Sequence, residues 1–432
     1  MLILTDDQRV GTLWAMPQVE RLLVGHGIRF ENAFVVNPLC CPSRASVLTG
    51  EYSHTTGVYT NNPPRGGAGA FRQDESSTIA TTLQAAGYNT ALFGKYLNRY
   101  TGTRIPPGWD RWFAFQDAPG RQYYVNYAVN DQGIIRSFGN SVGDYSTDVL
   151  TARAVSFIRR SRGPLFLYFA PFAPHDPATP ARRDEAAFSS LRPRRTPSYD
   201  EGDVRDKPSW IRLLPRFTST VKRHIAGIRH KQFQSLLAVD RAAARIVETL
   251  RATGRLSRTM IVFTSDNGLE WGEHRLPLLK GVPYEESIRV PMVVRYDPLT
   301  LTPLTDDRLV LNIDLAPTFA ALAGVSTPGA EGRSLLPLLY SPEGVWRRQF
   351  LIEHMRDRSQ PIDAPTYCAV RTDRYLYAQY ATGETELYDV LKDPFELDNR
   401  SGDLSFAAIR ERLSGRLAAL CLPPPPGLRV KR

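Results

Sequence analysis

The chain has 432 residues, of which 42% are hydrophobic and 23% are charged, an ordinary composition for a globular protein. This length exceeds one small core, so we expect one large α/β domain and a smaller second domain. The 54 lysines and arginines outnumber the 44 acidic residues, and the net charge of +10 favours an anionic ligand. Zinc-finger spacing, heptads beside a basic region and basic stripes with interleaved aromatic residues are all missing, so nucleic acid is not an expected partner.

The compartment is left open by the sequence. No apolar run reaches the roughly 18 residues that span a bilayer, so no transmembrane segment is expected. No signal peptide is visible, and residues 2–5 already have the continuous apolar pattern of a buried strand. If a leader peptide precedes this sequence, we expect an extracellular, periplasmic or lysosomal protein. If there is none, we expect a cytoplasmic protein. Cys368 and Cys421 could form a disulfide in an exported chain, and two free thiols are the alternative.

Two adjacent carboxylates, Asp6 and Asp7, follow the first predicted strand directly. Carboxylates placed side by side at a strand end repel each other unless a cation lies between them. Oxygen ligands of this kind suit calcium or magnesium. A solvated turn is the alternative interpretation of the pair.

A second motif lies between Leu39 and Gly50. Pro42 suits the first position of a helix and Gly50 the left-handed position that ends one, which predicts about two helical turns with Cys40 just before their start. Cys40 would then lie in the positive field of the helix N-terminus. Arg44, one turn along the same side, could bind an oxyanion beside Cys40. A buried cysteine in an ordinary helix cap is the alternative.

Further along, predicted strands alternate with predicted helices. The strands cover residues 88–93, 164–170 and 260–264, and the helices cover 78–86, 146–160 and a long stretch that ends near Gly254. This order is typical of a mostly parallel sheet with helices packed on it, and such sheets bind ligands beyond the carboxyl ends of their strands. Residues 182–206 are rich in Arg, Pro, Asp and Ser and are predicted to form a mobile loop or lid.

Polar residues follow these strands, so we expect them to meet at one edge of the sheet. One group could supply oxygen ligands for a divalent cation: Asp6, Asp7, Asp266 and Asn267. Another could supply positive charge for an anion: Arg44, Lys95, His175 and Lys280. A metal ion and cationic side chains around a nucleophile suit the transfer of a sulfuryl or phosphoryl group.

The motifs resemble those of the type I, formylglycine-dependent sulfatases, which belong to the alkaline phosphatase-like superfamily. The segment from Cys40 to Gly50 matches the signature C-x-P-S-R-x-x-x-L-T-G at every fixed position, and the other motifs follow in the family's order over nearly the whole chain. The resemblance implies a large mixed, mostly parallel sheet sandwiched by helices, followed by a smaller antiparallel-sheet domain. It also implies sulfate-ester hydrolysis by a formylglycine that a formylglycine-generating enzyme makes from Cys40.

The resemblance assigns roles to individual residues. One calcium ion would be bound by five positions: Asp6, Asp7, Asp266, Asn267 and the formylglycine made from Cys40. Arg44 would hold the formylglycine hydrate. The sulfate group would be held by Lys95, His175 and Lys280. Cys41 stands at the variable position of the signature and receives no role.

Three segments resemble the glucosamine-6-sulfatase and heparan endosulfatase branch of the family: residues 58–62, 94–98 and 105–109. This likeness implies a substrate such as 6-O-sulfated N-acetylglucosamine or a sulfated glycan. Many sulfatases carry Lys-x-His after the glycine, and the His assists release of sulfate, but Leu97 stands at that place here. We hypothesise that His54 takes over this step.

The end of the chain is predicted to form a second unit. We divide the chain into a catalytic domain, residues 1–345, and a small C-terminal domain, residues 346–432, that resembles the family's C-terminal domain. Short antiparallel strands are expected near residues 350–353, 367–370 and 375–380, and a helix at 405–420 and a disordered tail from Pro423 are expected after them.

Three alternatives to a sulfatase remain. The weakest is a nucleic-acid-binding protein, which would bind DNA tightly and in a salt-dependent way. A phosphodiester or phosphonate monoester hydrolase of the same superfamily would use the same metal and nucleophile. A non-catalytic protein that binds sulfated glycans would leave Cys40 unmodified.

Overall fold

A ten-stranded mixed sheet lies at the centre of the computed structural model, which describes residues 1–117, 123–192, 195–300, 302–341, 344–358, 362 and 364–431. The strands of this sheet are β1 (Leu2–Thr5), β2 (Ile28–Phe30), β4 (Asn89–Gly94), β5 (Arg111–Phe115), β6 (Ala128–Asp131), β7 (Ile134–Ser137), β8 (Leu165–Ala170), β9 (Ile261–Ser265), β10 (Met292–Arg295) and β11 (Leu304–Asp306). Their order across the sheet is β11-β2-β10-β9-β1-β8-β4-β5-β6-β7. A separate pair is formed by β3 (Ala33–Phe34) and β12 (Val310–Leu311).

The middle of the sheet is parallel. Strands β9, β1, β8, β4 and β5 run in one direction, with Leu2 of β1 opposite Tyr168 on one side and Val262 on the other. Strands β10, β6 and β7 pair in the antiparallel sense. The prediction of a mixed, mostly parallel sheet is therefore confirmed. The carboxyl ends of β1, β4, β8 and β9 lie at the same edge, which brings the residues that follow them together.

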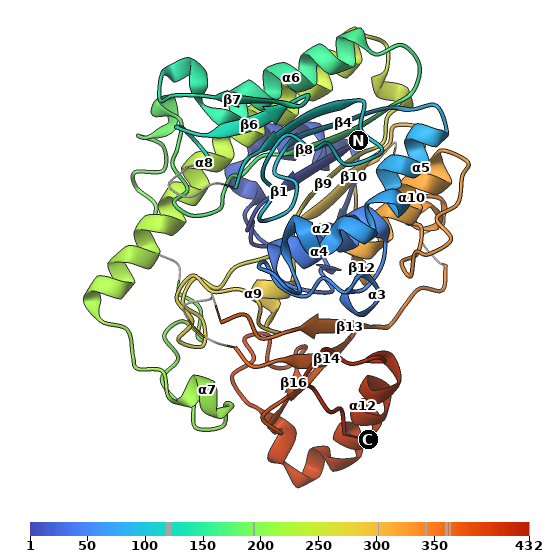
Figure 1. Ribbon diagram of the computed structural model, residues 1–432. Helices are drawn as coiled ribbons and strands as arrows, with labels where there is room; N and C mark the ends of the chain where they lie inside the picture. The colour runs from blue at the N-terminus through green and yellow to red at the C-terminus, as the bar shows by residue number, and fades with distance from the viewer. Residues whose placement is uncertain are drawn as a thin grey trace.

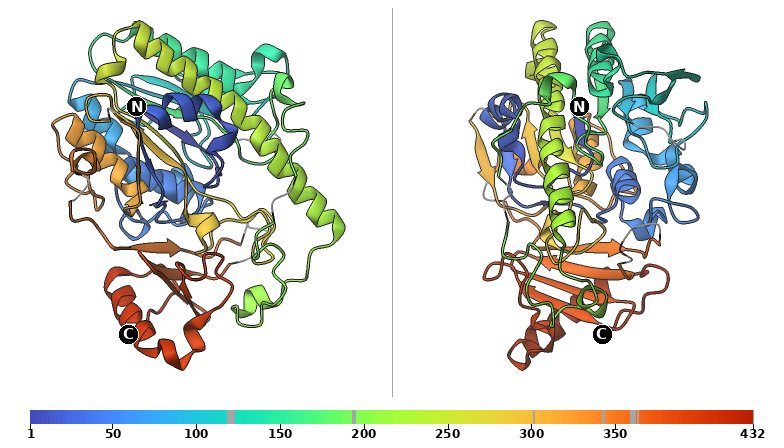
Figure 2. Two further views of the ribbon diagram at one scale, coloured as in Figure 1. Left: turned by 180° about the vertical axis from the view of Figure 1, so that it is seen from behind. Right: turned by 90° about the vertical axis from the view of Figure 1, so that its left-hand side faces the viewer.

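Helices cover both faces of the sheet. They are α1 (Pro17–Leu22), α2 (Cys40–Thr49), α3 (Ser53–Thr56), α4 (Gly67–Ala70), α5 (Ile79–Ala85), α6 (Ser146–Arg160), α7 (Ser209–Arg212), α8 (Ser219–Ala252), α9 (Glu285–Ile288), α10 (Leu315–Leu322), α11 (Leu336–Tyr340) and α12 (Ala407–Leu420). Alternate side chains of each strand point to opposite faces. Ile3 therefore packs in a core with α1, α6 and α8, and Leu4 packs in a core with α2, α5 and α10. Figure 2 shows α8 running across one face.

A four-stranded antiparallel sheet forms the C-terminal part, the lower lobe in Figure 1. Its strands are β13 (Gln349–His354), β14 (Tyr367–Thr372), β15 (Tyr375–Tyr380) and β16 (Thr385–Asp389), and α12 packs on them. The expected small antiparallel-sheet unit is thus confirmed, while the exact division at residue 345 stays a prediction. The backbone N–H of Glu353 donates to the carbonyl of Val36 at 2.8 Å, which ties this sheet to the segment before α2.

Two features of the C-terminal part bear on the expectations from the sequence: the state of its two cysteines and the packing of its last residues. A disulfide joins Cys368 of β14 to Cys421 at the end of α12, which decides between the two alternatives for these cysteines. The segment after Pro423 is packed, in contrast to the disordered tail that we expected. Leu428 is buried, and the backbone N–H of Lys431 donates to Gln379 at 2.8 Å. Apolar and backbone contacts therefore hold the tail against the small sheet.

The segment at residues 182–206 also differs from the mobile lid that its composition predicted, apart from residues 193–194, which lie outside the described residues. Asp184, Asp200 and Glu201 are buried. The backbone N–H of Asp200 donates to the carbonyl of Gly272 at 2.7 Å. No helix in the described ranges is both long and apolar enough to cross a membrane.

Candidate active site

Helix α2 positions Cys40 at the edge of the sheet where the carboxyl ends of the parallel strands lie. Gly50 ends the helix with φ +81°, as predicted, since glycine adopts this left-handed conformation without strain. The helix starts at Cys40, two residues before Pro42, so Cys40 is its first residue rather than the residue preceding it. Pro42 is still tolerated because backbone N–H groups in the first turn have no helical partner. Cys40 remains in the positive field of the helix N-terminus.

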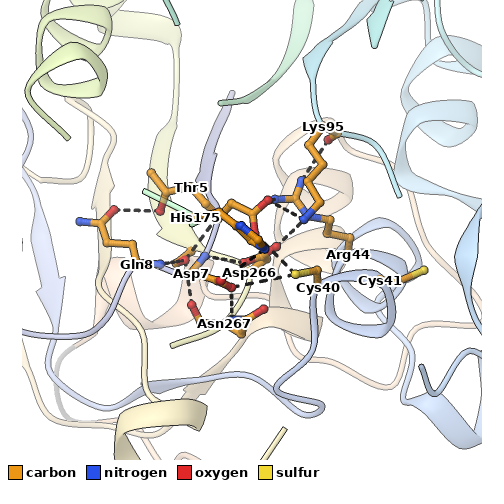
Figure 3. Close-up of polar contacts among 12 residues, drawn as sticks. Thr5, Asp7, Gln8, Cys40, Cys41, Arg44, Lys95, His175, Asp266 and Asn267 are labelled. Atoms are coloured by element: carbon orange, nitrogen blue, oxygen red, sulfur yellow. Dashed lines mark hydrogen bonds and ion pairs between the residues drawn. The ribbon is translucent and has the colours of Figure 1, made fainter. Parts of the chain in front are cut away.

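The predicted residues meet around Cys40 (Figure 3). Ligand atoms of Asp6, Asp7, Cys40 and His175 all lie within 4.8 Å of one another. The thiol Sγ of Cys40 lies 3.5 Å from Asp6 Oδ1 and 4.0 Å from Asp7 Oδ1. Cys41 points away from this cluster in Figure 3 and is buried in the core beneath α2.

The two residues that follow β9 complete the oxygen-rich side of the cluster. Asn267 Nδ2 donates to Asp7 Oδ1 at 2.6 Å, and Asp266 Oδ1 accepts the backbone N–H of Asp7 at 3.1 Å. Asn267 Oδ1 is buried and has no hydrogen-bond partner among the described residues. An orphaned amide oxygen beside two carboxylates is suited to a hard cation such as calcium.

Three cationic side chains and His175 surround the same carboxylates. Lys95 Nζ lies 2.5 Å from Asp6 Oδ2, and His175 Nε2 lies 3.5 Å from Asp7 Oδ2. Lys280 Nζ contacts Asp7 and lies 2.8 Å from Cys40 Sγ. The fully buried Arg44 places Nε 2.7 Å from Asp266 Oδ2 and Nη2 3.4 Å from Asp6 Oδ2. The structure thus brings all the predicted site residues together, while their individual roles stay predictions.

Burial controls the chemistry of the unmodified thiol. It raises the pKa of Cys40 to about 12, although Lys280 and Lys95 partly offset this effect. A thiol with such a pKa is protonated near neutral pH, and the thiolate is the nucleophilic form. An unmodified Cys40 would therefore be a poor nucleophile in this site.

A pocket of 260 Å³ opens beside the cluster. Lys95 and His175 line it together with Asn61, Tyr123 and Phe172. The rings of Tyr123 and Phe172 stack with centroids 4.3 Å apart, which gives the pocket an apolar wall beside Lys95 and His175. A larger cavity of 570 Å³ lies at the opposite end of the strands and contains none of the predicted site residues.

Asn61 and Phe172 are site residues to which the sequence reasoning gave no role. Asn61 Oδ1 accepts the backbone N–H of Cys41 at 2.9 Å and so holds the start of α2. Lys95 Nζ lies 5.5 Å from the ring centroid of Phe172. Asn61 belongs to a segment that resembled one sulfatase branch, a signal that could have drawn attention to it, whereas nothing in the sequence marked Phe172.

His54 does not join the cluster, so our hypothesis that it replaces the family histidine is not supported. Its Nδ1 lies 3.0 Å from Glu353 Oε2, and its Nε2 lies 3.4 Å from Glu331 Oε1. It lines a different pocket, with Tyr52 and Arg347. Both carboxylates come from distant parts of the chain, which is why the sequence around His54 did not reveal this environment.

His54 is instead expected to make stability depend on pH. Burial lowers its pKa, but hydrogen bonds with Glu331 and Glu353 outweigh this effect and raise it from 6.5 to about 10. The stabilisation is therefore complete below pH 6.5 and is lost as the pH rises towards 10. The difference in melting temperature between wild type and His54→Gln should shrink over this range, while turnover stays unchanged. A difference independent of pH, or trapped sulfated enzyme, would contradict this account.

Comparison with known proteins identifies the family. Residues 1–325 match the sulfatase family model, and residues 272–421 match the model for the C-terminal part of N-sulphoglucosamine sulphohydrolase. The chain belongs to the sulfatase family.

Several curated sulfatases are similar over most of this chain. The N-acetylglucosamine-6-sulfatase of Homo sapiens is 31% identical over 448 residues, which cover 92% of this chain and 80% of the human protein. The extracellular sulfatase SULF-1 homolog of Drosophila melanogaster is 38% identical over 366 residues, or 82% of this chain. The chain spans only 32% of that protein and 48% of its Caenorhabditis elegans counterpart.

Solved structures share the sulfatase fold over nearly the whole chain. A protein in complex with its substrate D-glucosamine-2-N,6-O-disulfate superposes with a TM-score of 0.82 at 24% identity, covering 98% of this chain and 97% of that one. The phosphonate monoester hydrolase of Agrobacterium radiobacter gives 0.76 at 21% identity, covering 98% and 95%. At these identities the likeness shows the fold alone.

Proposed function

We propose that this sulfatase-family protein hydrolyses sulfate esters, with a formylglycine made from Cys40 as nucleophile and one calcium ion as cofactor. The observation that carries the proposal is the position of Cys40 at the start of α2, with Lys280 Nζ 2.8 Å and Asp6 Oδ1 3.5 Å from its Sγ. Membership of the family supports the same conclusion. A formylglycine-generating enzyme is then a required partner in maturation.

The residues present fit a calcium ion. We assign it the ligands Asp6, Asp7, Asp266, Asn267 and the modified residue 40. The buried, unpartnered Oδ1 of Asn267 supports this assignment because calcium takes carboxylate and amide oxygens. Calcium there would neutralise negative charge beside residue 40.

The other site residues would take part in nucleophilic attack, proton transfer and binding of the sulfate group. Hydrated formylglycine supplies two hydroxyl groups on one carbon, so that one can take over the sulfuryl group and the other can expel sulfate as the aldehyde reforms. Arg44 would hold the hydrate, and a neighbouring carboxylate would accept the proton of the attacking hydroxyl. The sulfate oxygens would be bound by Lys95, His175 and Lys280.

His175 is the group that we propose to protonate the departing alcohol. Lys280 Nζ is held against Asp7 and Cys40, whose charges outweigh the effect of burial and raise its pKa well above its ordinary value. The side chain of His175 is 28% exposed and lines the 260 Å³ pocket where the alcohol would leave. An imidazole is also suited to proton transfer near neutral pH.

A His175→Gln variant tests this role. Its kcat on a sugar sulfate, whose alcohol needs a proton to leave, should fall by roughly 10²–10⁴-fold. On an aryl sulfate with a good leaving group, kcat should fall far less. Equal losses on the two substrates would indicate that His175 only binds sulfate.

Removal of calcium gives a further prediction. Chelation should lower kcat by roughly 10²-fold or more, because the charge around residue 40 loses its compensation, and added calcium should restore it. Asp7→Asn should need a higher calcium concentration for half-maximal activity. A chelated enzyme with full activity would rule out the assigned cofactor.

The substrate that we propose is a sugar carrying 6-O-sulfate, such as 6-O-sulfated N-acetylglucosamine or a glycan that contains it. The name of the human relative, N-acetylglucosamine-6-sulfatase, supports this choice. The pocket beside Lys95 and His175, with its stacked Tyr123 and Phe172, suits a sugar ring next to an anion.

The direct test is to compare sulfate release from N-acetylglucosamine-6-sulfate with hydrolysis of phosphodiester and phosphonate monoester substrates. The proposal predicts the largest kcat/KM on the sulfate ester. Faster phosphodiester or phosphonate cleavage would favour the alternative hydrolase of the same superfamily. Binding of sulfated glycan without turnover, in protein with an intact Cys40 thiol, would favour the non-catalytic alternative.

We propose that this protein acts in a compartment that permits disulfides, whether extracellular, periplasmic or lysosomal. The disulfide between Cys368 and Cys421 supports this, because disulfides persist mainly in such compartments. The name of the extracellular fly relative points the same way.

A further inference from the structure

A second group of metal-ligating side chains lies apart from Cys40, where the loop after β9 meets the C-terminal lobe. One ring nitrogen of His274 and one carboxylate oxygen from each of Glu286 and Glu396 all lie within 4.8 Å of one another. His274 belongs to the loop after β9, Glu286 to α9, and Glu396 to the segment after β16. His274 and Glu396 are fully buried, and Glu286 is 7% exposed.

The ring of His274 is oriented as metal-binding histidines are. Its Nδ1 lies 2.7 Å from Glu201 Oε2, and Glu201 in turn lies 3.4 Å from Lys207 Nζ. A carboxylate on one ring nitrogen fixes the proton there and leaves the other nitrogen with its lone pair. That other nitrogen, Nε2, is buried and finds no hydrogen-bond partner in the part of the chain that the structure describes.

Carboxylate oxygens in the same place are also left without partners. Glu396 Oε2 accepts the backbone N–H of Glu285 at 3.0 Å, but Oε1 is buried and unpartnered within the described ranges. Both oxygens of the fully buried Glu270 also lack a hydrogen-bond partner among the residues that the structure describes, and its carboxyl interacts electrostatically with those of Glu286 and Glu396. Buried polar atoms are rarely left in this state unless a ligand or water satisfies them.

The buried side chains around His274 also carry more negative than positive charge, which favours a bound cation. Arg9 lies 2.7 Å from Glu273 and 3.3 Å from Glu286, and Lys207 pairs with Glu201. Together with Arg371, whose charge acts on Glu396, these cations face five buried carboxylates: Glu201, Glu270, Glu273, Glu286 and Glu396. Such an excess of buried negative charge is costly unless it is neutralised.

We propose that His274, Glu286 and Glu396 bind a divalent transition-metal cation such as zinc, with the carboxylate of Glu270 as a further candidate ligand. An imidazole nitrogen combined with carboxylate oxygens is a typical zinc ligand set, whereas calcium and magnesium prefer oxygen alone. This site shares no ligand with the calcium site. Its ligands come from the loop after β9, from α9 and from the C-terminal lobe, so the ion joins these parts of the fold.

The test measures zinc in the full chain. The protein is stripped with a chelator, reloaded with zinc chloride in excess calcium, and freed of unbound metal before elemental analysis. The wild type should retain about one zinc per chain, and its melting temperature should rise by a few degrees on reloading. His274→Phe and Glu396→Gln should each weaken zinc binding by roughly 100-fold or more.

Two control variants define the site. Asp7→Asn alters the calcium site and should leave the zinc content unchanged. Glu386→Gln changes another fully buried carboxylate of the C-terminal sheet, one that accepts hydrogen bonds from Tyr284, Tyr380 and Tyr388, and should also keep its zinc.

X-ray absorption on the wild type provides a reading that does not depend on the variants' folding. It should show nitrogen and oxygen ligands and no sulfur, which separates this site from Cys40. A wild type that retains no zinc, a sulfur-containing ligand shell, or full zinc retention in His274→Phe and Glu396→Gln would overturn the proposal. None of these outcomes would bear on sulfate-ester hydrolysis.

Discussion

A Cys40→Ala variant should lose at least about 10³-fold in kcat on a sulfate ester, because it lacks the residue that forms the nucleophile. The rest of the site should remain in place. The side chain of Cys40 donates no more than two long contacts, to Asp6 and Asp7, and accepts one from Lys280 among the described residues. The variant should therefore still bind sulfated sugar. Steady-state kinetics and calorimetric titration with N-acetylglucosamine-6-sulfate would measure the two properties separately.

The neighbouring cysteine provides a matched control. Cys41 is buried in the core beneath α2 and points away from the cluster (Figure 3), so Cys41→Ala should lower stability modestly and leave kcat nearly unchanged. Similar kcat losses in the two variants would mean that the damage comes from the disturbed helix rather than from the missing nucleophile.

Replacement of Arg44 with methionine should destabilise the calcium-free protein by about 3–5 kcal/mol. Arg44 is fully buried and contacts the carboxylates of Asp266 and Asp6, which are fully buried as well. Its Nη1 also donates to the carbonyl of Lys95 at 3.0 Å. Methionine fills similar space but leaves two buried negative charges without this partner. Denaturant unfolding of both proteins in chelator would measure the change in free energy of unfolding.

An exposed ion pair of equal length shows how much of this effect comes from burial. Arg183 lies 2.7 Å from Asp148, but the two side chains are 41% and 32% exposed. Arg183→Met should therefore change the free energy of unfolding by less than about 1 kcal/mol. A loss in Arg44→Met no larger than this would contradict the role of Arg44 in compensating the buried carboxylates.

Much of the catalytic sheet could be predicted from the sequence because its strands are short apolar runs buried on both faces. Such runs mark β1, β8 and β9 clearly. The rule that ligands bind beyond the carboxyl ends of parallel strands then placed Asp6, His175 and Asp266 together. The signature around Cys40 drew attention to the proposed nucleophile, although α2 starts at Cys40, two residues before the predicted first position, Pro42.

The environments of His54, the chain end and His274 could not be predicted, because each depends on contacts between distant parts of the chain. Glu353 lies about 300 residues after His54, and nothing near His54 marks it as a partner. The tail after Pro423 has the composition of a flexible end, yet Leu428 finds a place in the core of the small lobe. The cluster around His274 likewise includes Glu396, which lies beside the loop after β9 only once the C-terminal sheet has folded.

The most direct test of the proposed function is a mass spectrum of the tryptic peptide of residues 30–44, from protein produced with a formylglycine-generating enzyme and treated with a thiol-alkylating reagent. This peptide contains both Cys40 and Cys41. The account predicts an aldehyde at position 40 and alkylation at Cys41 alone. Alkylation of both cysteines, in a preparation where a control sulfatase is converted, would contradict a formylglycine nucleophile.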